Sequence, residues 1–302
     1  MKTSLADLNI MDAFLFGKLM THPVYGVEFG KILIKTILGK EVPYLRVTAQ
    51  ALFYGADTNY HGIRLDAYLD EAAEGEETQP DQEIFDIEPD RNNRKEEVKA
   101  LPRRIRFYHT MIDQRALESG EGYENLRNVW VIMILSYDPV GEDRIVYTIR
   151  NHIVELPHIP YDDGARTMLL YTHGTKGPVS EELRQLLSYV EDTTREKAVN
   201  VNLHRVQEMV ESIKLDKEAN KEYMKSWEWE RKIKKEATEE GFNEGWQQGI
   251  EQGMQQGIEQ GIQQGIQQER INTERESRRA EEALREVSVL RARIAELEKT
   301  LG

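Results

Sequence analysis

EIFDIEPD, residues 83–90, decides the fold, because it alternates acidic and apolar residues and ends beside a proline. Alternation with a period of two predicts a β-strand with one apolar and one acidic face. A similar segment upstream, GIRLDAYL at residues 62–69, predicts a second strand. The two strands are expected to form a hairpin, and their connection, residues 71–80, is rich in Glu and Gly.

Further elements extend the hairpin in both directions. Residues 11–38 carry apolar side chains at helical spacing around His22-Pro23, which predicts two helices with Gly39 as the stop of the second. Strands are predicted at 44–55, 129–136, 143–149 and 168–174; the segment 129–136 is almost wholly apolar, as in a strand covered on both faces. Pro102 is expected in the first turn of a helix running to about residue 118. Amphipathic helices are predicted over 180–224. The first 175 residues therefore predict a mixed α/β domain.

The chain changes character at about residue 236. Seven glycines recur at every fourth position from Gly241 to Gly265, each followed by Phe, Trp, Ile or Met. A step of four residues advances a helix by about 400°, so the apolar stripe drifts around the axis, and each glycine costs about 1 kcal/mol relative to alanine. Residues 276–301 then carry apolar residues at steps of three and four, which predicts a short coiled coil. An amphipathic helix packed on its own domain is the alternative; we predict self-association.

Composition excludes several classes of protein. The 302 residues contain no cysteine, which rules out disulfides and thiolate metal sites, and the mean hydropathy is -0.64. No apolar run approaches the roughly 18 residues of a membrane span, and the N-terminus lacks the order of a signal peptide, so a cytoplasmic protein is expected. The seven histidines show no H-x-x-x-H spacing, and neither a P-loop nor a G-x-S-x-G motif occurs.

Local charge matters more than the net charge of -14. Residues 71–90 contain nine acidic residues and no basic one, whereas residues 91–110 contain seven Lys or Arg and two Glu. A basic segment after an acidic strand is suited to holding a phosphate chain beside a metal site. The alternative is a solvated helix face that balances nearby carboxylates.

The acidic face of the predicted hairpin carries the candidate chemistry. Asp86, Glu88 and Asp90 share one face of their strand, and Asp66 lies on the preceding strand. If the strands pair, Asp66 and Glu88 converge, and two close carboxylates stay ionised only when a cation bridges them. Mg²⁺ is typically bound by one or two carboxylates plus water and phosphate oxygens. Solvated carboxylates on an outward strand face are the simpler alternative.

These residues also carry a resemblance. The order of MDAFLFGKLM, HGIRLDAYLD, IFDIEPD and LPRRIRFYH resembles the PD-(D/E)XK nuclease family transposases, or recombination-promoting nucleases. VYTIRN, YDDGARTMLLYTHGTKG and the glycine-repeat tail are similar to a subgroup of that family. The resemblance implies a restriction-endonuclease-like mixed sheet flanked by helices, and Mg²⁺- or Mn²⁺-dependent cleavage of DNA. The expected segments are a nuclease-like domain at 1–178, a helical extension at 179–235, a glycine repeat at 236–272 and a coiled coil at 273–302.

The resemblance also implies roles for individual residues. Asp66 corresponds to the first metal-binding aspartate and Glu88 to the acidic residue of the (D/E)XK element. Asp12 corresponds to the aspartate of the N-terminal helix, an outer contact to metal or water. Arg104 and Tyr108 lie four residues apart on one helix face and are similar to a Gln-x-x-x-Tyr element, which implies that they bind phosphate or orient the carboxylates.

One position departs from the family pattern. Asp90 stands where the family has Lys or Gln, and an aspartate cannot orient an attacking water as a cation does. Three explanations remain open: Lys95, Lys99 or Arg104 supplies the charge, Asp90 adds a metal ligand, or catalysis is lost. The expected function is a metal-dependent DNA endonuclease; the alternative is a degenerate nuclease fold that serves as a DNA-binding or oligomeric scaffold.

Overall fold

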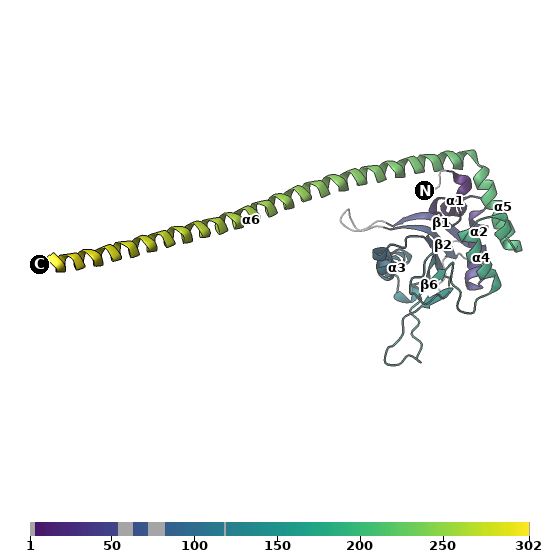
Figure 1. Ribbon diagram of the computed structural model, residues 1–302. Coiled ribbons are helices and arrows are strands. Elements are labelled where there is room, and N and C mark those ends of the chain that lie inside the picture. Colours follow the sequence, from purple (N-terminus) through teal and green to yellow (C-terminus); the bar gives the residue numbers. More distant parts are fainter. Residues whose placement is uncertain (1–3, 54–62, 72–81, 118, 302) are drawn as a thin grey trace. The chain divides into compact units, whose positions relative to one another are not determined.

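The computed structural model describes residues 4–53, 63–71, 82–117 and 119–301 (Figure 1). The chain divides into two compact units, Met1–Trp227 and Glu228–Gly302, called unit 1 and unit 2 below. Unit 1 holds the sheet and most of the helices. Helix α6 (Lys217–Leu301) begins in unit 1 and supplies the helix of unit 2. The predicted acidic connection of the hairpin falls mainly on residues 72–81, which lie outside the described residues.

The described residues of unit 1 form one mixed, six-stranded sheet in the order β1-β2-β3-β4-β6-β5. The first three strands pair antiparallel, β3 pairs parallel with β4, β4 pairs parallel with β6, and β5 closes the edge antiparallel to β6. The hairpin predicted from EIFDIEPD and GIRLDAYL is thereby confirmed as β2 and β3. The bounds of the strands are β1 (Leu45–Phe53), β2 (Ile63–Glu71), β3 (Ile84–Asp90), β4 (Val129–Leu135), β5 (Val146–Ile149) and β6 (Ala165–Tyr171).

Strand β4 is central and buried along its whole length. It has parallel neighbours on both edges and helices on both faces, which explains why its sequence, VWVIMIL, contains no polar residue. The prediction of a strand covered on both faces is confirmed.

Two helices precede the sheet, as predicted: α1 (Ala13–Thr21) and α2 (Gly26–Leu38). Gly39 ends α2 in the left-handed region with φ 69°, where glycine avoids the Cβ penalty of other residues. The predicted stop at Gly39 is confirmed. The later helices of unit 1 are α3 (Lys95–Ala116), α4 (Glu181–Glu191) and α5 (Val201–Leu215), and short 3₁₀ turns occupy Leu5–Asp7, Tyr123–Asn125 and Arg195–Lys197.

Helix α3 corrects the sequence prediction, because it begins at Lys95 and not near residue 101. Pro102 therefore lies inside the helix and not in its first turn. A proline there removes one backbone hydrogen bond and costs about 3 kcal/mol. Glu96 and Glu97 favour the earlier start because they lie at the positive end of the helix dipole, and burial of Leu101 and Ile105 under the helix offsets the proline.

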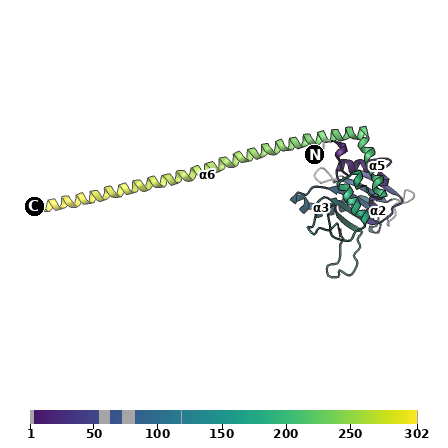
Figure 2. The same ribbon diagram turned by 45° about the vertical axis from the view of Figure 1, so that its right-hand side comes forward.

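The sheet separates two layers of helices (Figures 1 and 2). Helix α3 covers one face, where its Leu101, Ile105 and Ile112 pack with Val131 and Met133 of β4. Helices α1, α2, α4 and α5 cover the other face, and their apolar side chains join one core with the opposite side chains of β3 and β4. Helices α4 and α5 fall in the range expected as a helical extension, and they belong to this core.

Unit 2 is a helix, and its described apolar side chains are open to solvent. The residues that follow the glycines, at every fourth position from Phe242 to Ile266, are between 49% and 68% exposed. The side chains of Leu297 and Leu301, part of the expected coiled-coil seam, lie outside the described residues. Across the described part of the chain, no helix combines the length and the apolar character needed to cross a membrane.

Candidate active site

The acidic face of the hairpin lies under helix α3. Tyr68 pairs with Asp86, and Asp70 pairs with Ile84, across the antiparallel β2–β3 ladder. Continuing this register places Asp66 opposite Glu88, two residues beyond the last Cα pair of the ladder. At this position the backbone N–H of Asp66 donates a 2.6 Å hydrogen bond to Oε1 of Glu88. The structure thus brings together the two carboxylate residues that the sequence singles out.

Asp86 joins this pair, although sequence reasoning gave it no role. It lies two residues before Glu88 on the same face of β3, and its side chain is completely buried. Neither carboxylate oxygen of Asp86 has a hydrogen-bond donor within the described residues. Burial, with a smaller contribution from the nearby charge of Asp66, raises the pKa of Asp86 to about 8. The alternation in D-I-E was the available signal, since it places both acids on one face.

Glu88 is almost as deeply buried. Burial is the main reason that its pKa lies well above the ordinary value, and the negative charges of Asp86 and Asp66 add to the effect. The hydrogen bond from the Asp66 backbone acts in the opposite direction. Two ionised carboxylates can only accept hydrogen bonds, so neither of these side chains can stabilise the charge of the other. Asp86 and Glu88 therefore form a site that favours a proton or a cation.

Other acidic residues of the same strands are paired with cations. Asp70 forms an ion pair with Arg127 at 2.7 Å, and Glu83 contacts Arg166 at 2.8 Å and Lys40 at 3.0 Å. These pairs lie toward the start of β3, whereas Asp86 and Glu88 lie further along it. Lys and Arg side chains thus neutralise the carboxylates at this end of the hairpin. In contrast, no such ion pair is described for Asp86 or Glu88.

Asp90 occupies the third position of the motif and is held by protein groups. Oδ1 accepts a 2.7 Å hydrogen bond from the backbone N–H of Asn92. Oδ2 accepts hydrogen bonds from the guanidinium of Arg104 and, at 3.3 Å, from the hydroxyl of Tyr137. Both oxygens are therefore engaged, which argues against direct metal binding by Asp90. The contact instead fixes Arg104 at the end of β3.

Arg104 and Tyr108 lie one helical turn apart on α3, over the acidic face. The Nε of Arg104 is buried and has no hydrogen-bond partner within the described residues, so one donor of the guanidinium is unused. Burial raises the pKa of Tyr108, and the charge of Glu88 is the next cause. The aromatic hydroxyl of Tyr108 therefore lies near the carboxylates and stays protonated.

Asp12 belongs to a neighbouring cluster. It precedes α1, and its Oδ2 accepts a 2.7 Å hydrogen bond from the backbone N–H of Asn9. Its Oδ1 contacts Arg91, the residue after β3, at 3.5 Å. Arg91 also contacts Glu191 of α4 at 3.3 Å. These contacts connect Asp12 to the end of β3 through Arg91, and they do not run to Asp66 or Glu88.

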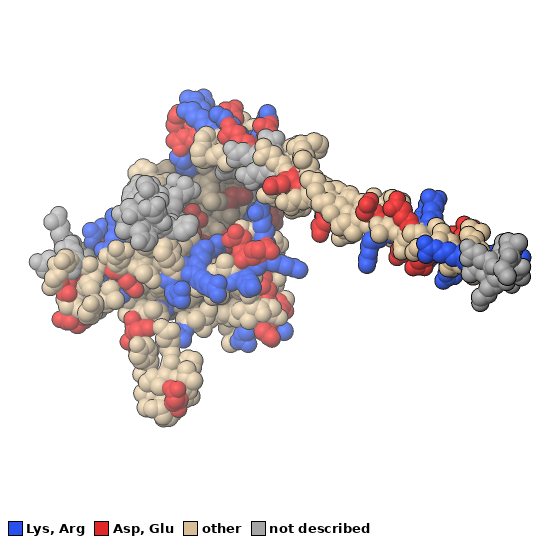
Figure 3. Space-filling model, turned by 90° about the vertical axis from the view of Figure 1, so that its left-hand side faces the viewer, with Lys and Arg blue, Asp and Glu red and all other residues tan. Residues whose placement is uncertain are grey.

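The outer face of α3 is basic. Lys95, Lys99, Arg103 and Arg106 are exposed and recur at steps of four, four and three, so they form one row along the helix, here called the basic row. Figure 3 views the molecule from the side on which α3 lies, and Lys and Arg atoms gather there. The basic row contains four of the seven Lys and Arg residues found in residues 91–110.

The buried carboxylates of β3 have the chemistry of ligands for a divalent ion. In the parts of the chain that the structure describes, no three His, Asp or Glu side chains are arranged to hold a metal by themselves. Mg²⁺ needs only one or two protein carboxylates, because water and phosphate oxygens complete its shell. Asp86 and Glu88 are adjacent acceptors, and Asp86 lacks any described donor. A hard cation is the kind of group that such residues accommodate.

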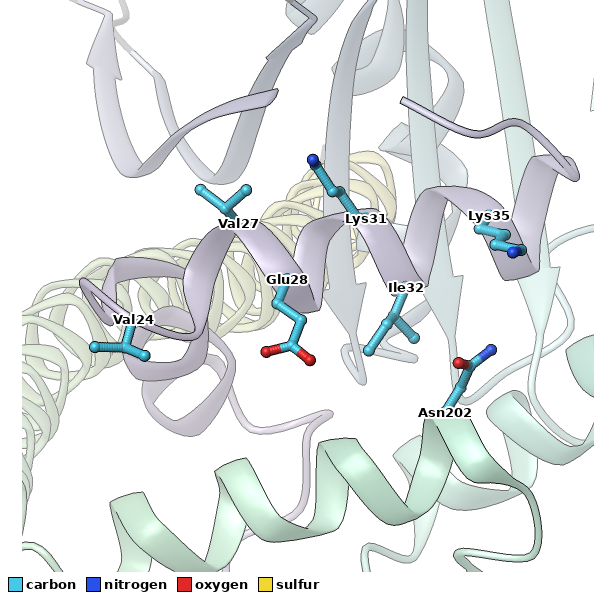
Figure 4. Close-up of a pocket in the computed structure, with 7 residues that line it drawn as sticks. All are labelled: Val24, Val27, Glu28, Lys31, Ile32, Lys35 and Asn202. Atoms are coloured by element: carbon cyan, nitrogen blue, oxygen red, sulfur yellow. The ribbon is translucent and has the colours of Figure 1, made fainter. Parts of the chain in front are cut away.

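A separate hollow lies on the other layer of unit 1, between α2 and the start of α5 (Figure 4). Its lining includes Glu28, Lys31 and Asn202. Glu28 is already held by Arg205 through hydrogen bonds of 2.8 and 2.9 Å. The sheet lies between this hollow and the layer of α3, so it takes no part in the carboxylate site.

Comparison of the chain with protein-family models, with curated proteins and with solved structures finds no match.

Proposed function

We propose that unit 1 is a Mg²⁺- or Mn²⁺-dependent DNA endonuclease with a restriction-endonuclease-like fold, of the recombination-promoting type. The observation that carries the proposal is the buried pair Asp86 and Glu88 on one face of β3, with the backbone of Asp66 against Glu88, under a helix with an exposed basic row. The antiparallel β1-β2-β3 sheet, followed by α3 and the parallel strand β4, supports the fold assignment. Cytoplasmic location and assembly through the tail belong to the same proposal.

Asp66 and Glu88 would hold the ion, with Asp86 beside them. The ion, when bound, supplies a polarised water and a positive charge next to the phosphate under attack. Arg104 takes the part of the missing lysine, since Asp90 fixes its guanidinium and holds this positive charge at the end of β3. Lys95, Lys99 and Arg103 would hold the DNA backbone by charge.

Nicking of supercoiled plasmid DNA tests this proposal. The full chain should nick the plasmid with Mg²⁺ or Mn²⁺ and not with EDTA, and Glu88→Gln and Asp66→Asn should each lower the rate by about 100-fold or more. Glu96→Gln, a change of an exposed glutamate on α3, is the matched control and should retain the rate. Equal nicking by Glu88→Gln and the native chain would show that this site is not responsible.

A second candidate is a DNA-binding protein that does not cleave. The pairing of Arg104 with Asp90 favours it, since the cation nearest the end of β3 is already partly neutralised. Salt-sensitive DNA binding without nicking under Mg²⁺ or Mn²⁺ would select this candidate. Reversal of the basic row, by Lys99→Glu with Arg103→Glu, should weaken binding in both cases, so only the nicking assay distinguishes them.

A further inference from the structure

A cavity lies beside the carboxylate site, under the same helix. It has a volume of about 390 Å³, within the range of small-molecule sites, and is enclosed by α3, by β5 and β6, and by the segments that flank β5. Leu101 and Ile105 line it from α3, and Ile149 and Leu169 line it from the sheet. These side chains offer apolar walls.

The strand register connects the cavity to the carboxylates. Glu88 pairs with Met133 of β4, and Met133 pairs with Leu169 of β6, which lines the cavity. Asp86 is connected through β4 to Thr167 of β6 in the same way. Two strand spacings correspond to about 10 Å. The cavity therefore lies level with the carboxylates along the strands, on the face that α3 covers.

The polar groups of the cavity are neutral or positive. Arg106 and Arg150 line it, and its lining contains no Asp or Glu, although the net charge of the chain is -14. His109 contacts Oγ1 of Thr167 through Nε2 at 3.0 Å, while its Nδ1 is buried without a hydrogen-bond partner within the described residues. Burial lowers the pKa of His109, and Asp163 opposes this effect. A ligand that fits has apolar parts for the walls and a negative charge for Arg106 and Arg150.

We propose that this cavity binds an unstacked nucleobase whose phosphate lies between Arg106 and Arg150. A base has apolar faces for the walls and polar edges for polar groups of the lining such as Asn151, and the phosphate supplies the negative charge. The inference rests on the proposed function, since a DNA strand with one phosphate at the carboxylates would place a neighbouring base in the cavity. A base of a single strand and a free nucleotide share this chemistry.

Fluorescence polarisation in EDTA tests the inference without cleavage. The probes are a labelled pentathymidylate and an abasic pentamer with the same phosphates; unlabelled thymidine monophosphate is the competitor. The full chain should bind the pentathymidylate about fivefold or more tightly than the abasic strand. Competition at the affinity of the pentathymidylate would identify a free-nucleotide site, whereas weak competition would identify a single-strand site. Equal binding of the two pentamers would overturn the proposal.

Matched variants localise the effect. Val140 is exposed and lines the cavity, so Val140→Trp should fill the cavity and abolish the preference for the base-bearing strand. Val154→Trp, exposed in a neighbouring loop and outside the lining, should leave this preference unchanged. Arg106→Glu should weaken binding of the pentathymidylate about fivefold or more, and Arg184→Glu, exposed on α4 and outside the lining, should leave this binding unchanged. Persistence of the preference in Val140→Trp would refute the assignment.

The two proposals fail separately. Base preference without metal-dependent nicking would retain the cavity and reject the nuclease. Nicking that depends on Glu88, with no base preference, would retain the nuclease and reject the cavity.

Discussion

Replacement of Asp86 by asparagine should stabilise the metal-free protein at neutral pH. The pKa of Asp86 rises from 3.8 in the unfolded chain to about 8 in the folded protein, mainly through burial. The folded chain therefore binds more protons than the unfolded chain between about pH 4 and pH 8, and the free energy of unfolding falls as the pH rises through this window. At pH 7 the penalty reaches up to about 4 kcal/mol.

Asparagine has the shape of aspartate but carries no charge, and its amide can donate to Glu88. We expect Asp86→Asn to raise the free energy of unfolding by about 3 kcal/mol at pH 7, and the melting temperature by roughly 6–12 °C. The gain should shrink toward zero near pH 4, where the native carboxyl is also protonated.

Thermal and urea unfolding in EDTA, followed by circular dichroism from pH 4 to pH 8, measures this effect. Asp7→Asn, the same change at an exposed aspartate, is the control and should alter stability by less than about 0.5 kcal/mol. Addition of Mn²⁺ should stabilise the native chain at pH 7 more than the variant, since the ion replaces the missing positive charge. Equal or lower stability of Asp86→Asn at pH 7 would refute the reasoning.

Three further outcomes are expected. Arg104→Gln leaves Asp90 without its cation and should cost about 1–3 kcal/mol in urea unfolding; an unchanged midpoint would show that the ion pair contributes nothing. Gly39→Ala should cost about 1 kcal/mol, because φ is 69° and only the backbone conformation opposes the new methyl group; a neutral result in thermal melts would contradict this. The full chain should sediment as an oligomer, and Ile258→Lys with Ile262→Lys should shift it toward monomer; a monomeric native chain would exclude association through the tail.

Much of the fold could be predicted from the sequence because its signals are local. The break at His22-Pro23, the stop at Gly39 and the alternation in β2 and β3 each depend on a few adjacent residues. The uninterrupted apolar sequence of β4 directly indicates that both faces of this strand are buried. The start of α3 could not be predicted in this way, because the proline suggested a first turn while burial of Leu101 and Ile105 against the sheet determined the outcome.

The site was predictable only as far as strand pairing determines it. Asp66 and Glu88 follow from the hairpin register, which the alternating pattern implies. Asp86 differs, since its lack of a donor depends on how α3 and β4 cover it. The ion pair between Asp90 and Arg104 likewise depends on the position of helix α3. The sequence predicted the start of this helix too late in the chain. The cavity beside β6 is lined by four separate segments of the chain, so no single sequence motif predicts it.

The glycine repeat has a geometrical consequence for any molecule that lies along unit 2. A ridge that recurs every fourth residue moves about 40° per step on a helix of 3.6 residues per turn, which amounts to about 240° between Phe242 and Ile266. A companion helix following that ridge must wind in the right-handed sense, whereas the three-and-four spacing after residue 276 requires left-handed winding. The two windings have opposite handedness. A companion helix that follows both must therefore change its sense of winding near residues 268–276.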